Sequence, residues 1–501
     1  MKYKLIGLGA AALLLVCAVI AQKAEPPKNR YHQHLESAQK QACTEHGDEL
    51  FCTHLPLMSI TTDSPIPDPY NYDENGELLL HESGSPIKNE ESVSATIRYF
   101  DSQSTNNHLT DAPVVSESAL IRIRGNSSRD FDKKGYLIKF KREDLISALD
   151  VSLSGMTADS KWVLHGPFLD KSLIRNYLCY NLAGEIMDYA PNVRFCELFL
   201  NDEYMGIYLL AEKVDYNSNG RIDIAKASPD ITSTAYILEV DRGLTDSSHS
   251  LETFANHAYL IVGREGVNQK LEIIYPGTSL TEDQYQFIQR DISQFEKTLY
   301  SFDYSDPKKG YAKYIDTQSF IDYFLINEFT LNYDAAGLST YLYKDIDGRL
   351  KMCVWDFNSA FDYYENSKTA TQSFNIQNKL WYKYLFKDEA FVDQVIKRYE
   401  KLRATYLKEE YLFEYIDSVV EYLGPAIERN FEKWGYSFDS AYDFLFPTER
   451  NVRSHEEAIS QIKQTITDRI DFMDNNIHRL YFVCHESVNK RYNHDKEGIF
   501  G

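Results

Sequence analysis

The hydrophobic periodicity of the chain changes along its length, and this change limits the possible folds more than any other feature of the sequence. Between Leu55 and Phe140, apolar residues alternate with polar ones in segments that are separated by clusters of Pro, Asp, Asn and Gly. A period of two is typical of half-buried strands. From Thr281, the expected N-cap of a helix, apolar residues recur with helical spacing. The sequence therefore predicts an α+β fold with a β-rich N-terminal part and a largely helical C-terminal part.

The segment 453–480 carries the clearest helical pattern. Ser454 and Glu457 have the spacing of a capping box, in which each residue bonds the backbone of the other. One face of this helix is apolar and is expected to pack in the core. Its residues are Ile459, Ile462, Ile466, Ile470, Met473, Ile477 and Leu480.

The middle of the chain joins these two parts. Residues 172–187 favour a helix, and 194–214 favour a hairpin that turns at Asn201 to Glu203. Two further strands are expected at 235–240 and 258–263.

Composition excludes some classes of partner. The chain has 501 residues, of which 43% are hydrophobic, and this is enough for a large core. Its formal charge of -22 argues against unspecific binding to nucleic acid or to an anionic membrane surface. A small polyanion needs only a local basic or metal site, so that class of ligand stays open.

The N-terminal segment indicates export. Lys2 and Lys4 precede an apolar run from Leu5 to Ala21, a pattern typical of a secretion signal. The run is also close to the length that spans a bilayer, so an uncleaved membrane anchor is the alternative. Residues 22–54 are polar and are expected to form a tether. The protein is therefore expected outside the cytoplasm, with membrane contact only through residues 1–21.

The cysteines fit this location. Cys43 and Cys52 are close enough in sequence to close a local disulfide, which an oxidising compartment permits. Cys179, Cys196 and Cys353 lie in predicted helices and strands and are expected to be small buried hydrophobes. No Cys or His spacing typical of a zinc site is present.

The stretch 332–361 places two aspartates around a predicted hairpin. The strands expected at 339–344 and 349–355 bring Asp334 and Asp356 to the same open end. One carboxylate at such a position can bind the divalent cation of a nucleotide, while the other accepts a proton from an attacking hydroxyl. Protein kinases place a catalytic Asp before a short hairpin and a metal-binding Asp after it. The alternative is that both are ordinary turn or capping residues.

Six segments of the sequence, taken in order, carry a resemblance to a known family. They are LIRIRGNSSRDFDKKGYLIKF (120–140), HGPFLDKSLIRNYLCYNLAGEI (165–186), RFCELFLNDEYMGIYLLAEKV (194–214), AYILEVD (235–241), NEFTLNYDAAGLSTYLYKD (327–345) and VWDFNSAF (354–361). Together they resemble the spore coat protein H (CotH) kinase family over roughly residues 55–480. The resemblance implies a bilobal fold like that of atypical protein kinases, a divalent metal, and phosphate transfer from ATP to proteins. The lobes it implies are 55–240 and 241–480, followed by a tail at 481–501.

The same resemblance assigns roles around the hairpin. Asp334 matches the family's catalytic aspartate, and Asp356 matches its metal-binding aspartate. Asn358 lies where many members have a second Asp, and Ser339 lies where many have Asn. Asn358 and Ser339 are both expected to be metal ligands, although a neutral oxygen binds a hard cation more weakly than a carboxylate does.

The loop 124–134 is the expected phosphate-binding element. Backbone N–H groups and basic side chains suit phosphate oxygens. The alternative is an ordinary solvated turn. The residues assigned to the nucleotide here are Arg124, Gly125, Asn126 and Ser127.

Lys139, on the next predicted strand, has the position of the phosphate-contacting lysine of a kinase, or else extends its stem along a strand edge. Glu212 is assigned as its partner, with Glu239 as the rival. Arg175 is either a phosphate contact or a buried arginine that ties the two lobes together.

Three functions are consistent with these residues. The first is an exported or membrane-tethered kinase that uses ATP with Mg²⁺ or Mn²⁺ to phosphorylate Ser or Thr of surface or spore coat proteins. The second is a pseudokinase that serves as a non-catalytic scaffold, with Ser339 and Asn358 marking lost chemistry. The third keeps the fold but transfers an adenylyl group to the acceptor.

Overall fold

The computed structural model describes residues 30–37, 51–81, 84–241, 249–257, 270–361, 363 and 372–484. The expected signal or anchor at 1–21, Cys43 with its predicted disulfide, and the strand expected at 258–263 lie outside these ranges. Within them, none of the helices has both the length and the apolar character needed to cross a membrane.

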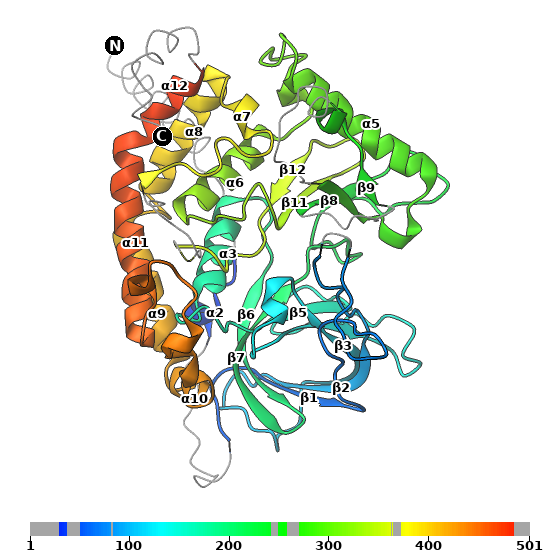
Figure 1. Ribbon diagram of the computed structural model, residues 1–501, viewed down its shortest axis with the longest axis vertical. Coiled ribbons are helices and arrows are strands. Elements are labelled where there is room, and N and C mark those ends of the chain that lie inside the picture. Colours follow the sequence, from blue (N-terminus) through cyan, green and yellow to red (C-terminus); the bar gives the residue numbers. More distant parts are fainter. Residues whose placement is uncertain are drawn as a thin grey trace, which may run out of the picture. The chain divides into compact units, whose positions relative to one another are not determined.

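Seven of the described strands close a barrel in the N-terminal part (Figure 1). Neighbouring strands are antiparallel except β1 and β6, which pair in parallel and close the barrel. Alternate side chains fill the interior, as the period of two predicts. In spatial order the strands are β1 (Leu57–Thr62), β2 (Val93–Phe100), β3 (Val115–Arg124), β4 (Gly135–Phe140), β5 (Lys161–His165), β7 (Glu203–Glu212) and β6 (Val193–Leu200).

A second sheet of five described strands contains the predicted hairpin. Its order is β12 (Lys351–Cys353), β11 (Thr340–Lys344), β8 (Tyr236–Asp241), β10 (Lys270–Tyr275) and β9 (Ser250–Leu251). Strand β8 pairs with β11 and not with the barrel. Hydrogen bonds to the hairpin thus attach β8 to the second sheet, and the lobe boundary predicted at residue 240 lies near the end of this strand.

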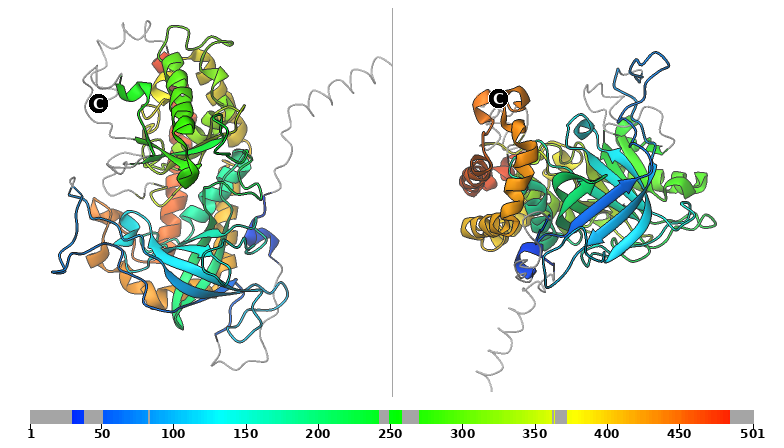
Figure 2. Two further views of the ribbon diagram at one scale, coloured as in Figure 1. Left: turned by 90° about the vertical axis from the view of Figure 1, so that its right-hand side faces the viewer. Right: turned by 90° about the horizontal axis from the view of Figure 1, so that it is seen from below.

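The C-terminal part is largely helical. The described helices are α2 (Gln33–Glu36), α3 (Arg175–Ile186), α5 (Glu282–Leu299), α6 (Thr317–Phe329), α7 (Tyr382–Leu385), α8 (Glu389–Arg403), α9 (Glu409–Leu423), α10 (Pro425–Trp434), α11 (His455–Asn476) and α12 (Tyr481–Cys484). This arrangement confirms the predicted α+β class, with a β-rich N-terminal part and a helical C-terminal part (Figure 2).

Both predicted N-caps, Ser454 and Thr281, are present, but the capping box predicted at Ser454 is only half formed. The Glu457 side chain accepts from the Arg453 N–H at 2.7 Å, one residue before Ser454. The Ser454 side chain accepts a hydrogen bond of 3.2 Å from the backbone N–H of Glu457 at the start of α11. Thr281 caps α5 through a capping box with Gln284. The expected apolar face of α11 is buried except at Ile459, which is half-buried.

Helix α3 lies between the barrel and the C-terminal helices (Figures 1 and 2). Every one of its residues is buried, because it contacts β6 on one side and α6 on another. A helix that is enclosed on all sides needs no polar face. Its Cys179 is buried, as are Cys196 on β6 and Cys353 on β12, which confirms the expectation for these three.

Part of the segment expected to be a tether is packed against the barrel. The Gln33 side chain donates to the carbonyl oxygen of Phe195 at 3.1 Å and accepts from the Phe195 N–H at 2.7 Å. Because a side-chain amide has the same donor and acceptor as a peptide group, Gln33 pairs with β6 as a strand residue would.

Candidate functional site

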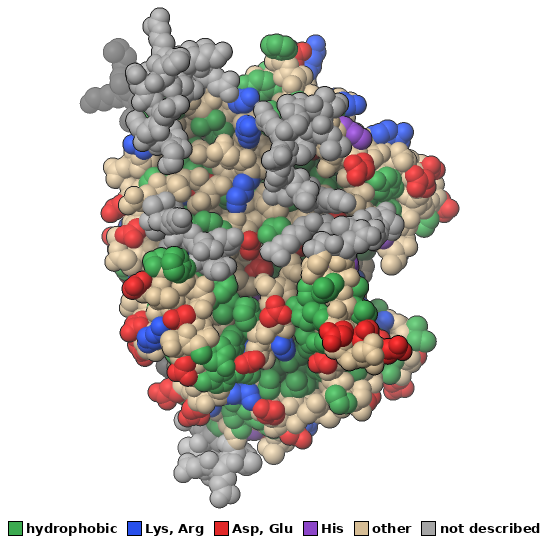
Figure 3. Space-filling model, viewed as in Figure 1, with side chains coloured by type: hydrophobic (Ala, Val, Ile, Leu, Met, Phe, Trp, Pro, Cys, Tyr) green, Lys and Arg blue, Asp and Glu red, His purple; other side chains and the backbone are tan. Residues whose placement is uncertain are grey.

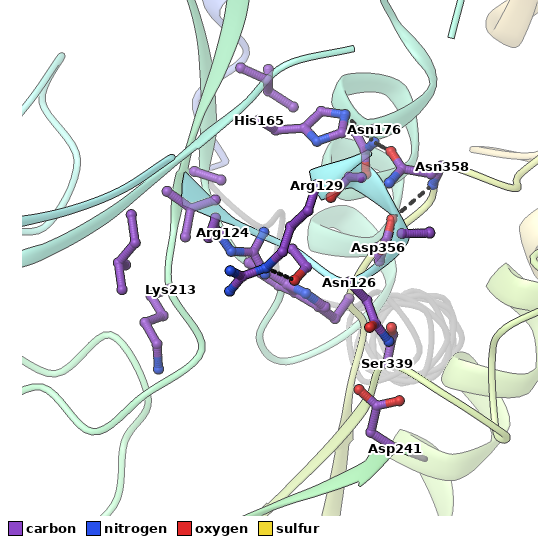
Figure 4. Close-up of a pocket in the computed structure, with 18 of the residues that line it drawn as sticks. Arg124, Asn126, Arg129, His165, Asn176, Lys213, Asp241, Ser339, Asp356 and Asn358 are labelled. Atoms are coloured by element: carbon purple, nitrogen blue, oxygen red, sulfur yellow. Dashed lines mark hydrogen bonds between the residues drawn. The ribbon is translucent and has the colours of Figure 1, made fainter. Parts of the chain in front are cut away.

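A cavity of about 340 Å³ lies between the barrel and the second sheet (Figure 4). The barrel contributes residues of β3, β4, β5 and β7 and the loop after β3. The opposite wall comes from α3, from β8 and β11, and from the residues that follow β12. The site is therefore built by segments that are far apart in the sequence.

Cationic side chains line the barrel wall of this cavity: Lys88, Arg122, Arg124, Arg129 and Lys213. Arg122 and Arg129 both form ion pairs with Glu90. Burial lowers the pKa of Lys88, and the neighbouring Arg129 lowers it further. Burial likewise lowers the pKa of Arg122. Such desolvated cations gain most from an anion that enters the cavity.

Carboxylates lie on the opposite wall, on Glu239 and Asp241 of β8 and on Asp356. Burial raises the pKa of Glu239, although a hydrogen bond from the Tyr341 side chain opposes this effect. Burial also raises the pKa of Asp356 to about 6, and the charge of Asp334 adds to the increase. A cavity with cations on one wall and carboxylates on the other suits an anion that carries a metal ion.

The loop after β3 requires glycine at position 125. Gly125 has a φ of +120°, and a Cβ atom there would meet Ser128 Oγ at 1.9 Å. Arg129 fastens the loop, since its Nε donates to the Gly125 carbonyl at 2.7 Å. Its Nη1 donates to the carbonyl oxygens of Pro69 and Asn89 at 3.0 and 2.9 Å. With its side chain so engaged, Arg129 positions the loop, while Arg124 lines the cavity.

Asp356 has a left-handed backbone conformation, with a φ of +55°. Its N–H donates to the Tyr180 hydroxyl at 3.0 Å, and Asn332 Nδ2 donates to its carbonyl oxygen at 3.1 Å. The Asp356 Oδ1 atom accepts from the Asn358 N–H at 3.1 Å. Positive φ values recur nearby at Leu331, Ala336, Ser339 and Phe361. Backbone strain of this kind clusters at functional sites, where the surrounding structure holds it in place.

Asn176 on α3 determines how Asn358 is oriented. Its Oδ1 accepts from the Phe357 N–H at 2.9 Å, so its Nδ2 must face the other way. That nitrogen donates to Asn358 Oδ1 at 2.7 Å and lies 3.2 Å from His165 Nε2 (Figure 4). Because the oxygen of Asn358 faces Asn176, its NH₂ group has no hydrogen-bond partner among the described residues.

The same hydrogen bonds define the tautomer of His165. Its Nε2 accepts from Asn176, so a neutral ring carries its proton on Nδ1. Burial lowers the pKa of His165 to about 4, which keeps the ring neutral. His165 therefore supports Asn176, and Asn176 in turn supports the segment from Asp356 to Asn358.

Asp334 lies beside the cavity without lining it. Its negative charge raises the pKa of Asp356, so the two carboxylates interact, as the hairpin predicts. Its backbone carbonyl accepts from the N–H groups of Gly337 and Leu338 at 3.0 and 2.7 Å. Lys379 donates to the carbonyl oxygens of Tyr333 and Ala335. Burial lowers the pKa of Lys379, and the charge of Asp334 opposes this effect.

The remaining predicted residues divide into two groups. Those that line the cavity are Arg124, Gly125, Asn126, Ser127, Ser339, Asp356 and Asn358. Lys139 is not a lining residue, although it shares a face of β4 with Leu137, which is one. Burial and the charges of Arg122 and Lys161 lower the pKa of Lys139.

Glu212 does not face the cavity. Leu209 and Ala211 line the cavity, and alternate side chains of a strand point to opposite faces, so Glu212 points away. It accepts from the Asn192 backbone at 2.9 Å and lies 3.5 Å from Arg221. The rival, Glu239, is the glutamate that lines the cavity.

Arg175 also has a structural position. It is fully buried, forms an ion pair with Asp170, and donates to the Ala360 carbonyl at 3.0 Å. These contacts fit the alternative in which it ties two parts of the chain together.

Sequence reasoning missed Lys88, His165 and Asn176. Asn176 directly follows Arg175 in a segment that carried the family resemblance. Because that segment was expected to be a core helix, nothing local distinguished a polar residue that reaches across to Asn358.

The donor set fits a divalent cation that is shared with phosphates. Among the described residues, no three His, Cys, Asp or Glu side chains converge on one point. Mg²⁺ is usually held by one or two carboxylates together with substrate phosphates and water. Asp356, with Ser339 nearby in the same cavity, meets this requirement.

The fold and the cavity thus define an α+β protein with a partly buried, oppositely charged site between a barrel and a second sheet. The family model described as CotH kinase protein matches residues 121–473, and the chain belongs to this family. It is also similar to the inner spore coat protein H of Bacillus subtilis (strain 168), with 23% identity over 245 residues. That match covers 48% of this chain and 58% of the relative.

Proposed function

We propose that this chain is a metal-dependent protein kinase that transfers phosphate from ATP to Ser or Thr of surface or spore coat proteins. The observation that carries the proposal is Asp356, a carboxylate with a raised pKa that faces a cationic wall across one cavity. Family membership and the resemblance to a spore coat protein support the same function.

In this proposal the fold is a bilobal, atypical kinase fold. The barrel is the N-terminal lobe, and the second sheet with the helices is the C-terminal lobe, so the domain is still taken as about 55–480. Export, with residues 1–21 as signal or anchor, belongs to the same proposal. It would place the enzyme with its coat or surface acceptors.

Each residue of the site has a separate role in the proposed reaction. Asp356 and Ser339 would hold Mg²⁺ or Mn²⁺, which would neutralise charge on the phosphates. Arg124 and the N–H groups of the loop 125–127 contact phosphate oxygens. Asp334 accepts the proton of the acceptor hydroxyl, whose oxygen bonds the γ-phosphorus as ADP leaves.

Intact-mass analysis of residues 22–501 after incubation with ATP and Mn²⁺ tests the proposal. Phosphate-sized additions are expected on the chain or on an added protein acceptor. They should be absent with Asp334→Ala and Asp356→Ala. Adenylate-sized additions would replace the proposal with adenylyl transfer. If the chain binds no ATP, whether Mn²⁺ is present or absent, the non-catalytic scaffold is favoured.

The orientation of Asn358 leads to a separate prediction. Since its oxygen faces Asn176, we expect its NH₂ group to donate to a phosphate and not its oxygen to bind the metal. Asn358→Ala should weaken ATP binding in EDTA by roughly tenfold to a hundredfold, the range expected for a hydrogen bond to a charged group. Calorimetric titration with and without Mn²⁺ measures this.

A metal-ligand role for Asn358 predicts the opposite pattern. The variant would then bind ATP normally in EDTA and lose affinity only with Mn²⁺. Ser339→Ala is the matched control, since Ser339 is proposed as a metal ligand and should show that second pattern.

A further inference from the structure

Exposed apolar side chains line a protruding ribbon next to the candidate site. The 70–88 ribbon is described over residues 70–81 and 84–88, where isolated bridges join Tyr70 to Lys88, Tyr72 to Leu78, and Leu80 to Pro86. Its exposed apolar residues are Tyr72 (48%), Leu78 (38%), Leu79 (39%) and Leu80 (52%). Single exposed leucines are common on protein surfaces, but a group on one projecting element is typical of a protein contact.

A second apolar group lies near the ribbon. Tyr436 and Tyr442 are 37% and 40% exposed, and their ring centroids are 5.2 Å apart. Both pack against Phe168, whose ring centroid lies 6.2 and 5.9 Å from theirs. Phe131, in the loop after β3, stacks on Phe168 at 5.9 Å.

The loop 124–134 connects both groups to the cavity. The Tyr70 hydroxyl donates to Asp130 at 2.7 Å, and the Tyr436 hydroxyl donates to Asp132 at 2.8 Å. The first residues of this loop line the cavity, as does Lys88 at the base of the ribbon. A chain that is bound across the two groups therefore passes next to the site proposed for phosphate transfer.

The charge of this surface is negative. Asp68, Asp73, Glu74 and Glu77 lie on or beside the ribbon, and the sequence from Asp68 to Ile87 contains no Lys or Arg. In the view of Figure 3, the lower half of the molecule shows hydrophobic side chains with acidic side chains beside them and a few basic ones between them. Like charges repel, so an acidic partner is disfavoured and a basic one is attracted.

We propose that the 70–88 ribbon, together with Tyr436 and Tyr442, is the docking surface for the protein acceptor. The docked segment carries apolar side chains next to Lys or Arg. Leucines and tyrosines of the surface bury the apolar side chains, while Glu74 and Glu77 attract the cations. This inference rests on the proposed function, because it takes the adjoining cavity as the place of phosphate transfer.

A peptide library with one fixed serine and randomised flanking positions tests this surface. Binding is measured on the Asp334→Ala chain, and phosphorylation is measured on the chain with Asp334 intact. The binding assay and the phosphorylation assay are both expected to enrich peptides with apolar residues together with Lys or Arg. In the background used for each assay, the triple variant Leu78→Ser, Leu79→Ser, Leu80→Ser should lose the apolar preference. For a selected peptide, the KM of the triple variant should be roughly tenfold higher than that of its parent chain, with kcat unchanged.

Matched variants control for surface changes in general. Phe302→Ser removes a fully exposed side chain that follows α5, and it should leave both preferences intact. Glu77→Lys should remove the preference for cations, whereas Glu421→Lys on α9 should not. All replaced side chains are exposed, so the variants are expected to fold, which thermal unfolding verifies.

Docking and phosphate transfer can fail separately in this experiment. In one outcome, the Asp334→Ala chain selects apolar and basic peptides through the leucines, but no chain phosphorylates them. This outcome supports the docking surface and contradicts the kinase function. The docking proposal is overturned if the triple variant keeps the apolar preference, if acidic peptides are selected, or if no peptide is enriched.

Discussion

Asp356→Asn is expected to abolish metal-dependent nucleotide binding and phosphate transfer, and at the same time to stabilise the apo protein. Burial and the charge of Asp334 raise the pKa of this carboxyl to about 6, so above that pH the folded chain holds a disfavoured charge. A difference of two pKa units corresponds to about 3 kcal/mol. Asparagine removes the charge but keeps the oxygen that accepts from the Asn358 N–H.

The stabilisation should depend on pH in a defined direction. A carboxyl whose pKa is raised by folding destabilises the folded state above its folded pKa. The difference in unfolding free energy between Asp356→Asn and the parent should thus be largest above pH 7. It should shrink as the pH falls through 6, and vanish near pH 4. Urea unfolding of the metal-free protein at a series of pH values measures it.

Asp241→Asn is the matched control, since it removes another carboxylate from the same cavity. It should retain metal-dependent binding. If Asp356→Asn instead destabilised the apo protein, Asp356 would be a structural residue, and the metal-binding role would be lost.

Asp334→Ala is expected to bind nucleotide and metal normally while phosphate transfer falls by about 10²-fold to 10⁴-fold. Asp334 is proposed to act on the acceptor hydroxyl, so nucleotide binding does not require it. Its removal should also lower the pKa of Asp356, because its charge contributes to the raised value. The midpoint of metal-dependent nucleotide binding should therefore move to lower pH.

The shift of this pH midpoint distinguishes an Asp334 that acts in the site from a residue that only supports the fold. Calorimetric titrations of Mn²⁺ and nucleotide between about pH 4.5 and 7.5, a range around the Asp356 pKa, provide the measurement. Asp347→Ala, at the exposed turn of the same hairpin, should change neither transfer nor the midpoint. Loss of nucleotide binding in Asp334→Ala would contradict the assignment.

Much of the candidate site could be predicted because its parts are local. The hairpin 332–361 brings Asp334 and Asp356 to one end through strand pairing and a short turn, and both follow from neighbouring residues. The loop at Arg124 to Ser127 was recognised in the same way, from Gly125 and its polar neighbours. Predictions that required a strand's orientation relative to a distant segment were less successful, since Glu212 faces away from the cavity and Lys139 lies beyond its lining.

The orientation of Asn358 shows why pattern alone was insufficient. Its position after Asp356 indicated a metal ligand, by analogy with an aspartate. Only the contact with Asn176 on α3 shows which end of the amide faces the cavity. The sequence separates these two residues widely, so no local rule connects them.

The sequence by itself determined the change from a β-rich to a helical part, the capped starts of α5 and α11, and the hairpin with its two aspartates. These depend on periodicity and on turn or cap chemistry, which act between residues close in the chain. The tertiary structure decided that β1 closes the barrel on β6, that β8 joins the hairpin, and that the pKa of Asp356 is raised. These depend on burial and on charges from distant segments, which exist only once the chain has folded.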